Sequence, residues 1–175
     1  MKELLDKISS YNLFNYLLPG ILFAALAQDM IRFPLLQRDV FSAAFLCYFV
    51  GLAISRFGSV ILEPLLKWLG FVKYGPYRDF VQASKKDDQL AVLSEVNNTY
   101  RTLCAMLILL LLLKLWMKIE GRLPSLVPWN ATALAIVLLV LFLFSYRKQS
   151  AYVTKRIDAN KHEPTHSKGA VAGDK

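Results

Sequence analysis

Hydrophobic positions are gathered in four long stretches of the chain, which charged and polar segments separate. Each stretch holds 15 or 16 residues, slightly fewer than the roughly 20 that span a hydrocarbon core as a helix. Flanking Tyr, Trp, Lys and Arg side chains extend such stretches to the lipid headgroups. The stretches are Leu13–Ala27, Val40–Ile54, Thr102–Met117 and Ala131–Tyr146. They predict transmembrane helices at about residues 11–30, 40–58, 102–118 and 129–146.

Composition favours lipid over water around these helices. Of the 175 residues, 55% are hydrophobic and 19% are charged, against about 45–50% and 25% in soluble globular proteins. The alternative is a soluble bundle of four buried helices. Leu107–Leu113 is an unbroken run of Leu and Ile, which leaves no polar face for water. The fold class is therefore all-α, an integral membrane four-helix protein.

The distribution of positive charge predicts the orientation of the chain. Lys and Arg exceed Asp and Glu by 21 to 13, a net charge of +8. Of the 21 Lys and Arg residues, sixteen lie before the first stretch, between the second and third, or after the fourth. The other five belong to the side of the membrane that the remaining two connections would face. Cytoplasmic segments carry the excess of Lys and Arg, so both termini and the long middle segment are expected in the cytoplasm. A nucleic-acid partner would need a basic face on a folded soluble domain, and the sequence indicates none.

A cleaved signal peptide is the alternative interpretation of the first stretch. Ala25–Ala27 has the small residues of a cleavage site and follows an apolar core. Glu3 and Asp6 oppose this interpretation, because the segment that begins a signal peptide is basic. We therefore expect the first stretch to be retained as a helix.

The middle segment, residues 59–101, is predicted to form a helical cytoplasmic elbow. Apolar periodicity continues from Phe57 to Phe71, and Pro64 is expected to bend that helix or to start a new one. We expect a short helix at Tyr77–Ala83 and another that begins at Gln89 and runs into the third span. Four residues are predicted to contact lipid headgroups: Arg56, Lys67, Trp68 and Lys73.

After the fourth span the helix is expected to continue to about Ala159. Residues 1–159 would then form the transmembrane domain, and residues 160–175 a disordered basic tail. The tail includes His162–His166, a match to the zinc-protease pattern H-E-x-x-H. Pro164 separates the two histidines and no apolar scaffold surrounds them, so we interpret the match as coincidental. The four apolar stretches lack Asp, Glu and His; we predict no catalytic residues, metal site or cofactor.

Small side chains form a stripe along one face of the second predicted helix. They recur every four residues, a spacing that lets helices approach closely in lipid. Two interpretations stay open, packing against other helices of the same chain or a seam between subunits of a homo-oligomer. The stripe consists of Ala43, Cys47, Gly51, Ser55 and Ser59.

The first predicted helix carries polar residues near a proline. Asn12 and Asn15 are three positions apart and share a face. Pro19 cannot donate to the carbonyl group of Asn15, so we expect a kink there. The asparagines would either satisfy the freed backbone or line a polar path.

Three segments together resemble a poorly characterised family of small, multi-pass bacterial inner-membrane proteins. They are Ser10–Gly20 (SYNLFNYLLPG), Ser55–Lys67 (SRFGSVILEPLLK) and Ser94–Arg101 (SEVNNTYR). Members of this family are often associated with antiviral-defence or mobile-element loci. The resemblance covers roughly residues 9–101 and implies a bacterial inner-membrane protein in a defence role, with no catalytic residue to transfer.

Two functions are compatible with these patterns. The first is a non-enzymatic, oligomeric membrane effector that acts on membrane integrity. The second is a membrane anchor or scaffold that recruits a cytosolic partner protein through its elbow and tail. Membrane lipids, further copies of the chain and a cytosolic protein are the expected partners.

Overall fold

A computed structural model describes residues 13–31 and 39–161, and these residues are helical with short connections. The all-helical prediction is confirmed for this part of the chain. Asn12 and the tail from His162 onward lie outside the described residues. The elements are η1 (Leu13–Leu17), α2 (Leu18–Ile31), α3 (Val40–Phe57), η2 (Gly58–Leu62), α4 (Glu63–Trp68), α5 (Tyr77–Ser84), α6 (Gln89–Glu120), η3 (Pro124–Trp129) and α7 (Asn130–Lys161).

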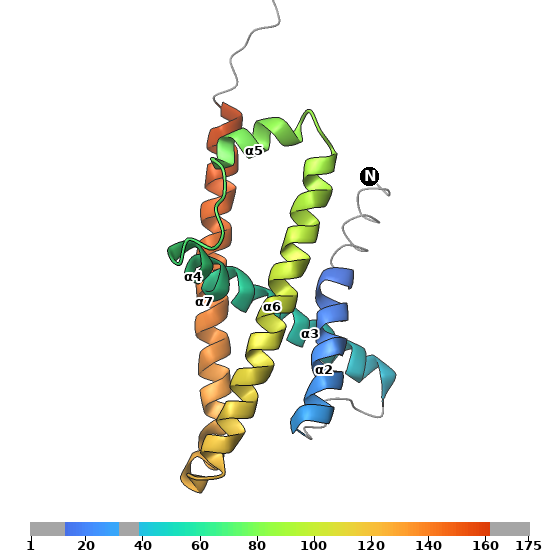
Figure 1. The fold of residues 1–175 in the computed structure, drawn as a ribbon, viewed down its shortest axis with the longest axis vertical. Helices are drawn as coiled ribbons and strands as arrows, with labels where there is room; N and C mark the ends of the chain where they lie inside the picture. The colour runs from blue at the N-terminus through green and yellow to red at the C-terminus, as the bar shows by residue number, and fades with distance from the viewer. Residues whose placement is uncertain (1–12, 32–38, 162–175) are drawn as a thin grey trace, which may run out of the picture.

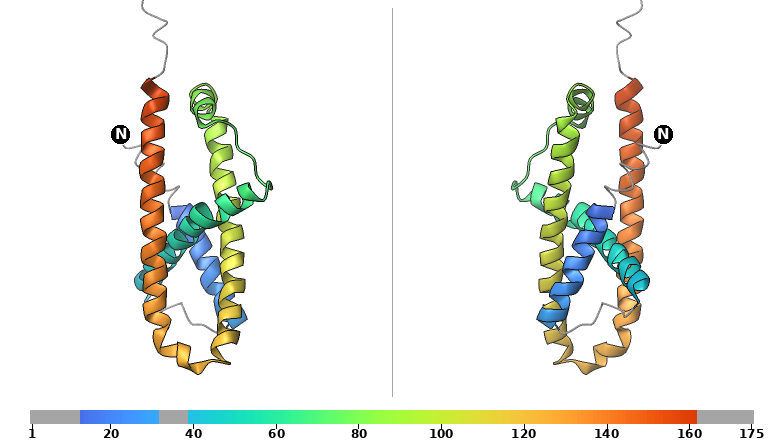
Figure 2. Two further views of the ribbon diagram at one scale, coloured as in Figure 1. Left: turned by 90° about the vertical axis from the view of Figure 1, so that its left-hand side faces the viewer. Right: turned by 90° about the vertical axis from the view of Figure 1, so that its right-hand side faces the viewer.

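The two longest helices, α6 and α7, form an antiparallel pair. The short helix η3 joins them at one end, and α5 lies across the other end (Figure 1). The continuous α3–η2–α4 segment crosses this pair obliquely, as both side views in Figure 2 show. Helix α2 packs against α3 and α6. The chain therefore forms a long hairpin with a shorter pair of helices on its flank.

Three described helices are long and apolar enough to cross a membrane. They are Val40–Trp68, Gln89–Glu120 and Pro124–Ala159, which contain the second, third and fourth predicted spans. The first predicted span is divided between the π-helix η1 and α2, which has 14 residues. At 1.5 Å per residue α2 alone is about 21 Å long, short of a hydrocarbon core of about 30 Å.

The helix of the second predicted span continues past residue 58, as the apolar periodicity from Phe57 to Phe71 indicated. Pro64 has no N–H group for the carbonyl of Val60, which would interrupt an α-helix at this point. The π-helix η2 shifts the hydrogen-bond register, and the Glu63 N–H bonds to the Gly58 carbonyl. Pro64 then lies in the first turn of α4, where no intrahelical donor is needed. The helix therefore runs unbroken to Trp68.

The elbow and tail helices match their predicted positions closely. Helix α5 was expected at Tyr77–Ala83 and ends one residue later. Helix α6 begins at Gln89 and enters the third span without a break, as predicted. Helix α7 extends to Lys161, two residues beyond the predicted limit.

Asp39 sets the start of α3. Its carboxylate accepts a hydrogen bond from the Ser42 backbone N–H at 2.8 Å, which caps the helix. The same hydrogen bond holds the pKa of Asp39 below its ordinary value. The charge-assisted cap is therefore weakened only at a pH below the ordinary pKa of aspartate.

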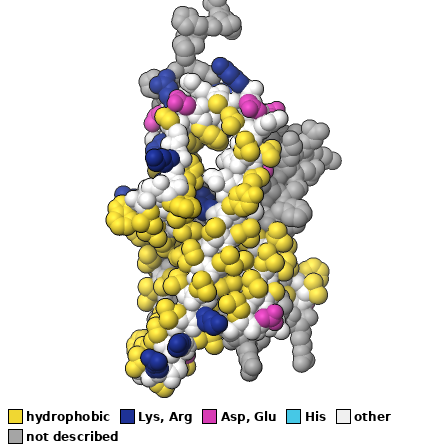
Figure 3. All heavy atoms as spheres, viewed as in Figure 1, with side chains coloured by type: hydrophobic (Ala, Val, Ile, Leu, Met, Phe, Trp, Pro, Cys, Tyr) yellow, Lys and Arg dark blue, Asp and Glu magenta, His cyan; other side chains and the backbone are white. Residues whose placement is uncertain are grey.

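The buried core is small and lies where α2, α3, η2 and α6 meet. Its residues are Ala27, Ile54, Leu62, Ala105, Met106 and Leu110. Each of the three long apolar helices contains an 18-residue apolar window, and only part of that window is buried. The buried share is 33% in Val40–Trp68, 22% in Gln89–Glu120 and 6% in Pro124–Ala159. Hydrophobic side chains dominate the middle of the face in Figure 3, while most charged side chains lie toward its ends. This distribution fits helices whose outer faces contact hydrocarbon.

Candidate functional site

Four charged side chains form an ion cluster where α4 approaches α6 and α7. Glu63 is at its centre, with a side chain that is only 7% exposed. Its Oε1 accepts from Lys67 Nζ at 2.7 Å, and its Oε2 accepts from Arg101 Nη1 at 2.9 Å and Lys148 Nζ at 3.2 Å. One carboxylate thus binds cations from three helices. We call Glu63, Lys67, Arg101 and Lys148 the ion cluster.

Local structure explains how each member reaches the centre. Lys67 follows Glu63 by four residues, one helical turn, so the two side chains lie on one face of α4. Arg101 comes from α6 and Lys148 from α7. The Lys148 ammonium also donates to the Ser59 carbonyl in η2, where the altered hydrogen-bond register leaves that oxygen accessible. The π-helix therefore helps to build the cluster as well as to accommodate Pro64.

The cluster carries an excess of positive charge. Three cations face one carboxylate, and the Arg101 and Lys148 side chains are only 19% and 26% exposed. The buried Arg101 Nε has no hydrogen-bond partner among the residues that the structure describes. Because buried charges are costly unless they are paired, Glu63 is the group that makes this arrangement stable.

The four residues predicted to contact lipid headgroups fall into two groups, those with partners in the chain and those that are exposed. Arg56 Nη2 donates to the Tyr16 hydroxyl at 2.8 Å, which ties α3 to η1. Lys67 belongs to the ion cluster, and its Nζ also lies 4.2 Å from the ring centroid of Tyr74. Trp68 is 81% exposed and Lys73 is also exposed. Two of the four therefore have partners within the chain, and two are open to the surroundings.

The small-residue stripe faces η1 and α2 of the same chain around its centre. Cys47, Gly51 and Ser55 are buried, while Ala43 and Ser59 are half-buried. A Cβ atom at Gly51 would lie 1.7 Å from the Tyr16 carbonyl oxygen. A Cβ at Gly20 would lie 1.8 Å from the Cys47 carbonyl oxygen. The two glycines therefore let the backbones of α2 and α3 touch, and intrachain packing occupies this part of the stripe.

The predicted kink in the first helix coincides with an irregular backbone. The π-helix η1 contains Asn15 and ends directly before α2, in which Pro19 is the second residue. Asn15 is only 9% exposed, and its Oδ1 has no hydrogen-bond partner within residues 13–31 and 39–161. The structure thus brings Asn15 and Pro19 together at the irregularity.

Sequence reasoning did not identify the ion cluster. Arg101 and Lys148 were interpreted only as orientation signals, and they lie 38 and 85 positions from Glu63. Glu63 also lies seven positions from Arg56, a spacing that allows a pair on one helical face, yet Arg56 binds Tyr16 instead. One local signal was available, since a single acidic residue within an apolar helix calls for a partner.

The described residues contain no group of three or more His, Cys, Asp or Glu side chains placed to hold a metal ion. No family model, curated protein or solved structure matches this chain. The family resemblance that three sequence segments indicate stays a prediction. Among the described residues, the ion cluster and the helices that extend beyond the apolar stretches are the features that bear on function.

Proposed function

We propose that the chain is a bacterial inner-membrane anchor that presents a rigid helical platform to a cytosolic protein partner. The platform consists of α5, residues 89–101 of α6 and residues 147–161 of α7. Both long helices continue about 20 Å past the apolar stretches at a rise of 1.5 Å per residue. Helix α5 lies across their ends (Figure 1). The distribution of positive charge supports a cytoplasmic position for the platform.

The observation that carries this proposal is an apolar stripe on the platform. Val92, Val96 and Tyr100 recur every four residues along α6 and are 58%, 41% and 64% exposed. Leu93 lies beside them and is 61% exposed. These residues precede the third apolar stretch, so hydrocarbon would not cover them. Exposed apolar patches outside the membrane mark surfaces where other proteins bind.

The ion cluster supports the same role. It ties α4, α6 and α7 together at the base of the platform, and Val81 of α5 is buried. A docking surface binds more tightly when it is already ordered, because less conformational entropy is lost on association. The cluster would thus hold the α6 stripe in a fixed orientation for the partner.

A photo-crosslinking residue at Val96 tests the proposal in cells. We expect a discrete adduct between the chain and a different protein, and loss of that adduct when Val92 and Tyr100 are both changed to Ser. The same crosslinker at Leu139 is the matched control, since Leu139 is 61% exposed in the middle of the fourth span. Only lipid should lie beside it. No adduct at Val96, or an adduct with a second copy of the chain alone, would contradict recruitment of a partner.

The second candidate is an oligomeric effector that acts on membrane integrity in antiviral defence. Asn15 favours it, because a buried amide oxygen without a partner beside a π-helix is a polar group at membrane depth. Such a group would be satisfied if the helices separated around water. A membrane-potential dye tests this function in cells that express the chain with and without its gene neighbours. The effector function predicts depolarisation, and a retained potential in every combination would exclude it.

A further inference from the structure

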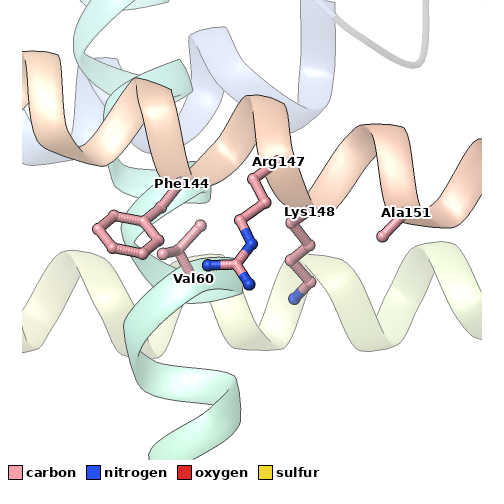
Figure 4. A pocket seen from close by; sticks show the side chains of 5 residues that line it. All are labelled: Val60, Phe144, Arg147, Lys148 and Ala151. Atoms are coloured by element: carbon pink, nitrogen blue, oxygen red, sulfur yellow. The ribbon is translucent and has the colours of Figure 1, made fainter.

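A small groove lies beside the ion cluster, between η2 and α7. Its volume is about 250 Å³, and its lining residues are Val60, Phe144, Arg147, Lys148 and Ala151. Figure 4 shows the side chains of Phe144 and Arg147 beside Val60 of η2. Lys148 follows on α7, and its Nζ donates to the Ser59 carbonyl in η2. The groove thus has an apolar part at Val60 and Phe144 and a cationic part at Arg147 and Lys148.

The cationic part of the groove has no anion of its own. Arg147 is exposed and makes no hydrogen bond or ion pair with another described residue. Lys148 shares the single carboxylate of Glu63 with two further cations. With Arg147 included, four cations and one carboxylate lie in and next to the groove. A guanidinium group with free donors in such a field is suited to a phosphate group.

The position of the groove indicates where that phosphate comes from. Phe144 belongs to the last turn of the fourth apolar stretch, and Arg147 and Lys148 are the first charged residues after it. Exposed Tyr146 lies at the same level of α7, as is typical of aromatic residues at the headgroup boundary. A ligand here has its polar group beside Arg147 and its apolar part along Val60 and Phe144.

We propose that this groove binds an anionic glycerophospholipid, with the lipid phosphate at Arg147 and the start of an acyl chain against Val60 and Phe144. Basic pockets on the cytoplasmic side of membrane helices bind anionic headgroups in this way. The bound lipid would supply the negative charge that the ion cluster lacks. The inference requires that the chain spans a membrane, but it does not depend on partner docking.

Native mass spectrometry of the full chain in detergent tests the assignment. We expect the wild type to retain phosphatidylglycerol about fivefold more strongly than phosphatidylcholine with the same acyl chains, the preference that one cation near a lipid surface provides. Arg147→Gln should abolish most of that preference. Arg156→Gln is the matched control, because Arg156 is an exposed arginine on the same helix outside the groove.

Three other outcomes would overturn the assignment. Equal retention of the two lipids by the wild type would show that the net negative charge of the headgroup is not recognised. Equal losses in Arg147→Gln and Arg156→Gln would show general surface attraction. Displacement of phosphatidylglycerol by millimolar inorganic phosphate would show a site for soluble anions. Equal melting temperatures of the lipid-free variants would establish that both are folded.

Discussion

Gly51→Ala is expected to lower the free energy of unfolding by about 3 kcal/mol, the upper part of the usual range for overpacked cores. The added Cβ would lie 1.7 Å from the carbonyl oxygen of Tyr16 and 2.7 Å from its carbonyl carbon. Both atoms belong to the backbone, so no side-chain rotation relieves the contact. Helices α2 and α3 must separate, and buried surface on both is lost. Unfolding by SDS in mixed micelles, followed by circular dichroism, measures the change.

Two other glycines provide matched controls for this substitution. Gly75→Ala should change the unfolding free energy by less than about 0.5 kcal/mol, because no atom lies within 4 Å of its added Cβ. Gly58→Ala should fall between the two, since its nearest contact is the Ala105 Cβ at 3.2 Å. If Gly51→Ala and Gly75→Ala were equally stable, the backbone contact would be absent. If Gly51→Ala instead left the unfolding free energy unchanged and caused only a concentration-dependent dissociation of subunits, Gly51 would lie at a subunit seam.

Glu63→Gln is expected to cost about 3 kcal/mol, because removing one partner leaves buried charges uncompensated. The substitution preserves side-chain volume and removes the single negative charge of the ion cluster. Arg101 and Lys148, whose side chains are 19% and 26% exposed, would then repel each other. We expect α7 to separate from α4 and α6 near the ion cluster. The same mixed-micelle titration gives the free energy, and hydrogen exchange shows which helices loosen.

Glu95→Gln is the control for the charge change. Glu95 is exposed on α6, and its side chain makes none of the ion pairs that surround Glu63. The effect should be within about 0.5 kcal/mol. Increased hydrogen exchange confined to α4 and the platform in Glu63→Gln would support the role of the cluster. An unchanged stability and exchange pattern would show that the cations are solvated independently of Glu63.

Periodicity in the sequence predicted the elements but not all of their limits. Helices α5 and α6 were located closely because each begins at a polar segment and carries a regular apolar face. The helix that contains the second predicted span continues without a break to Trp68, whereas Pro64 was expected to bend that helix or to start a new one. The cause is the π-helix η2, which accommodates Pro64 by a change of hydrogen-bond register. Apolar periodicity alone does not predict that change of hydrogen-bond register.

Contacts between distant residues explain the rest of what sequence reasoning left open. The stripe through Gly51 was visible in the sequence, but its partner Gly20 was not, because nothing local relates the two backbones. The ion cluster joins residues up to 85 positions apart, and its cations were first interpreted as orientation signals. Those interpretations are compatible, since a cation at the membrane boundary can both set topology and pair with a buried carboxylate.

Cysteine labelling tests the central claim, that the chain crosses the bilayer with η3 and α5 on opposite faces. Single cysteines replace Ser125 in η3 and Gln82 in α5, both exposed positions, in a background with Cys47 and Cys104 changed to Ala. In spheroplasts, a membrane-impermeant maleimide should label the Ser125 position at once and the Gln82 position only after permeabilisation. Equal labelling of both positions before permeabilisation, or a chain that stays in solution without detergent, would contradict the account.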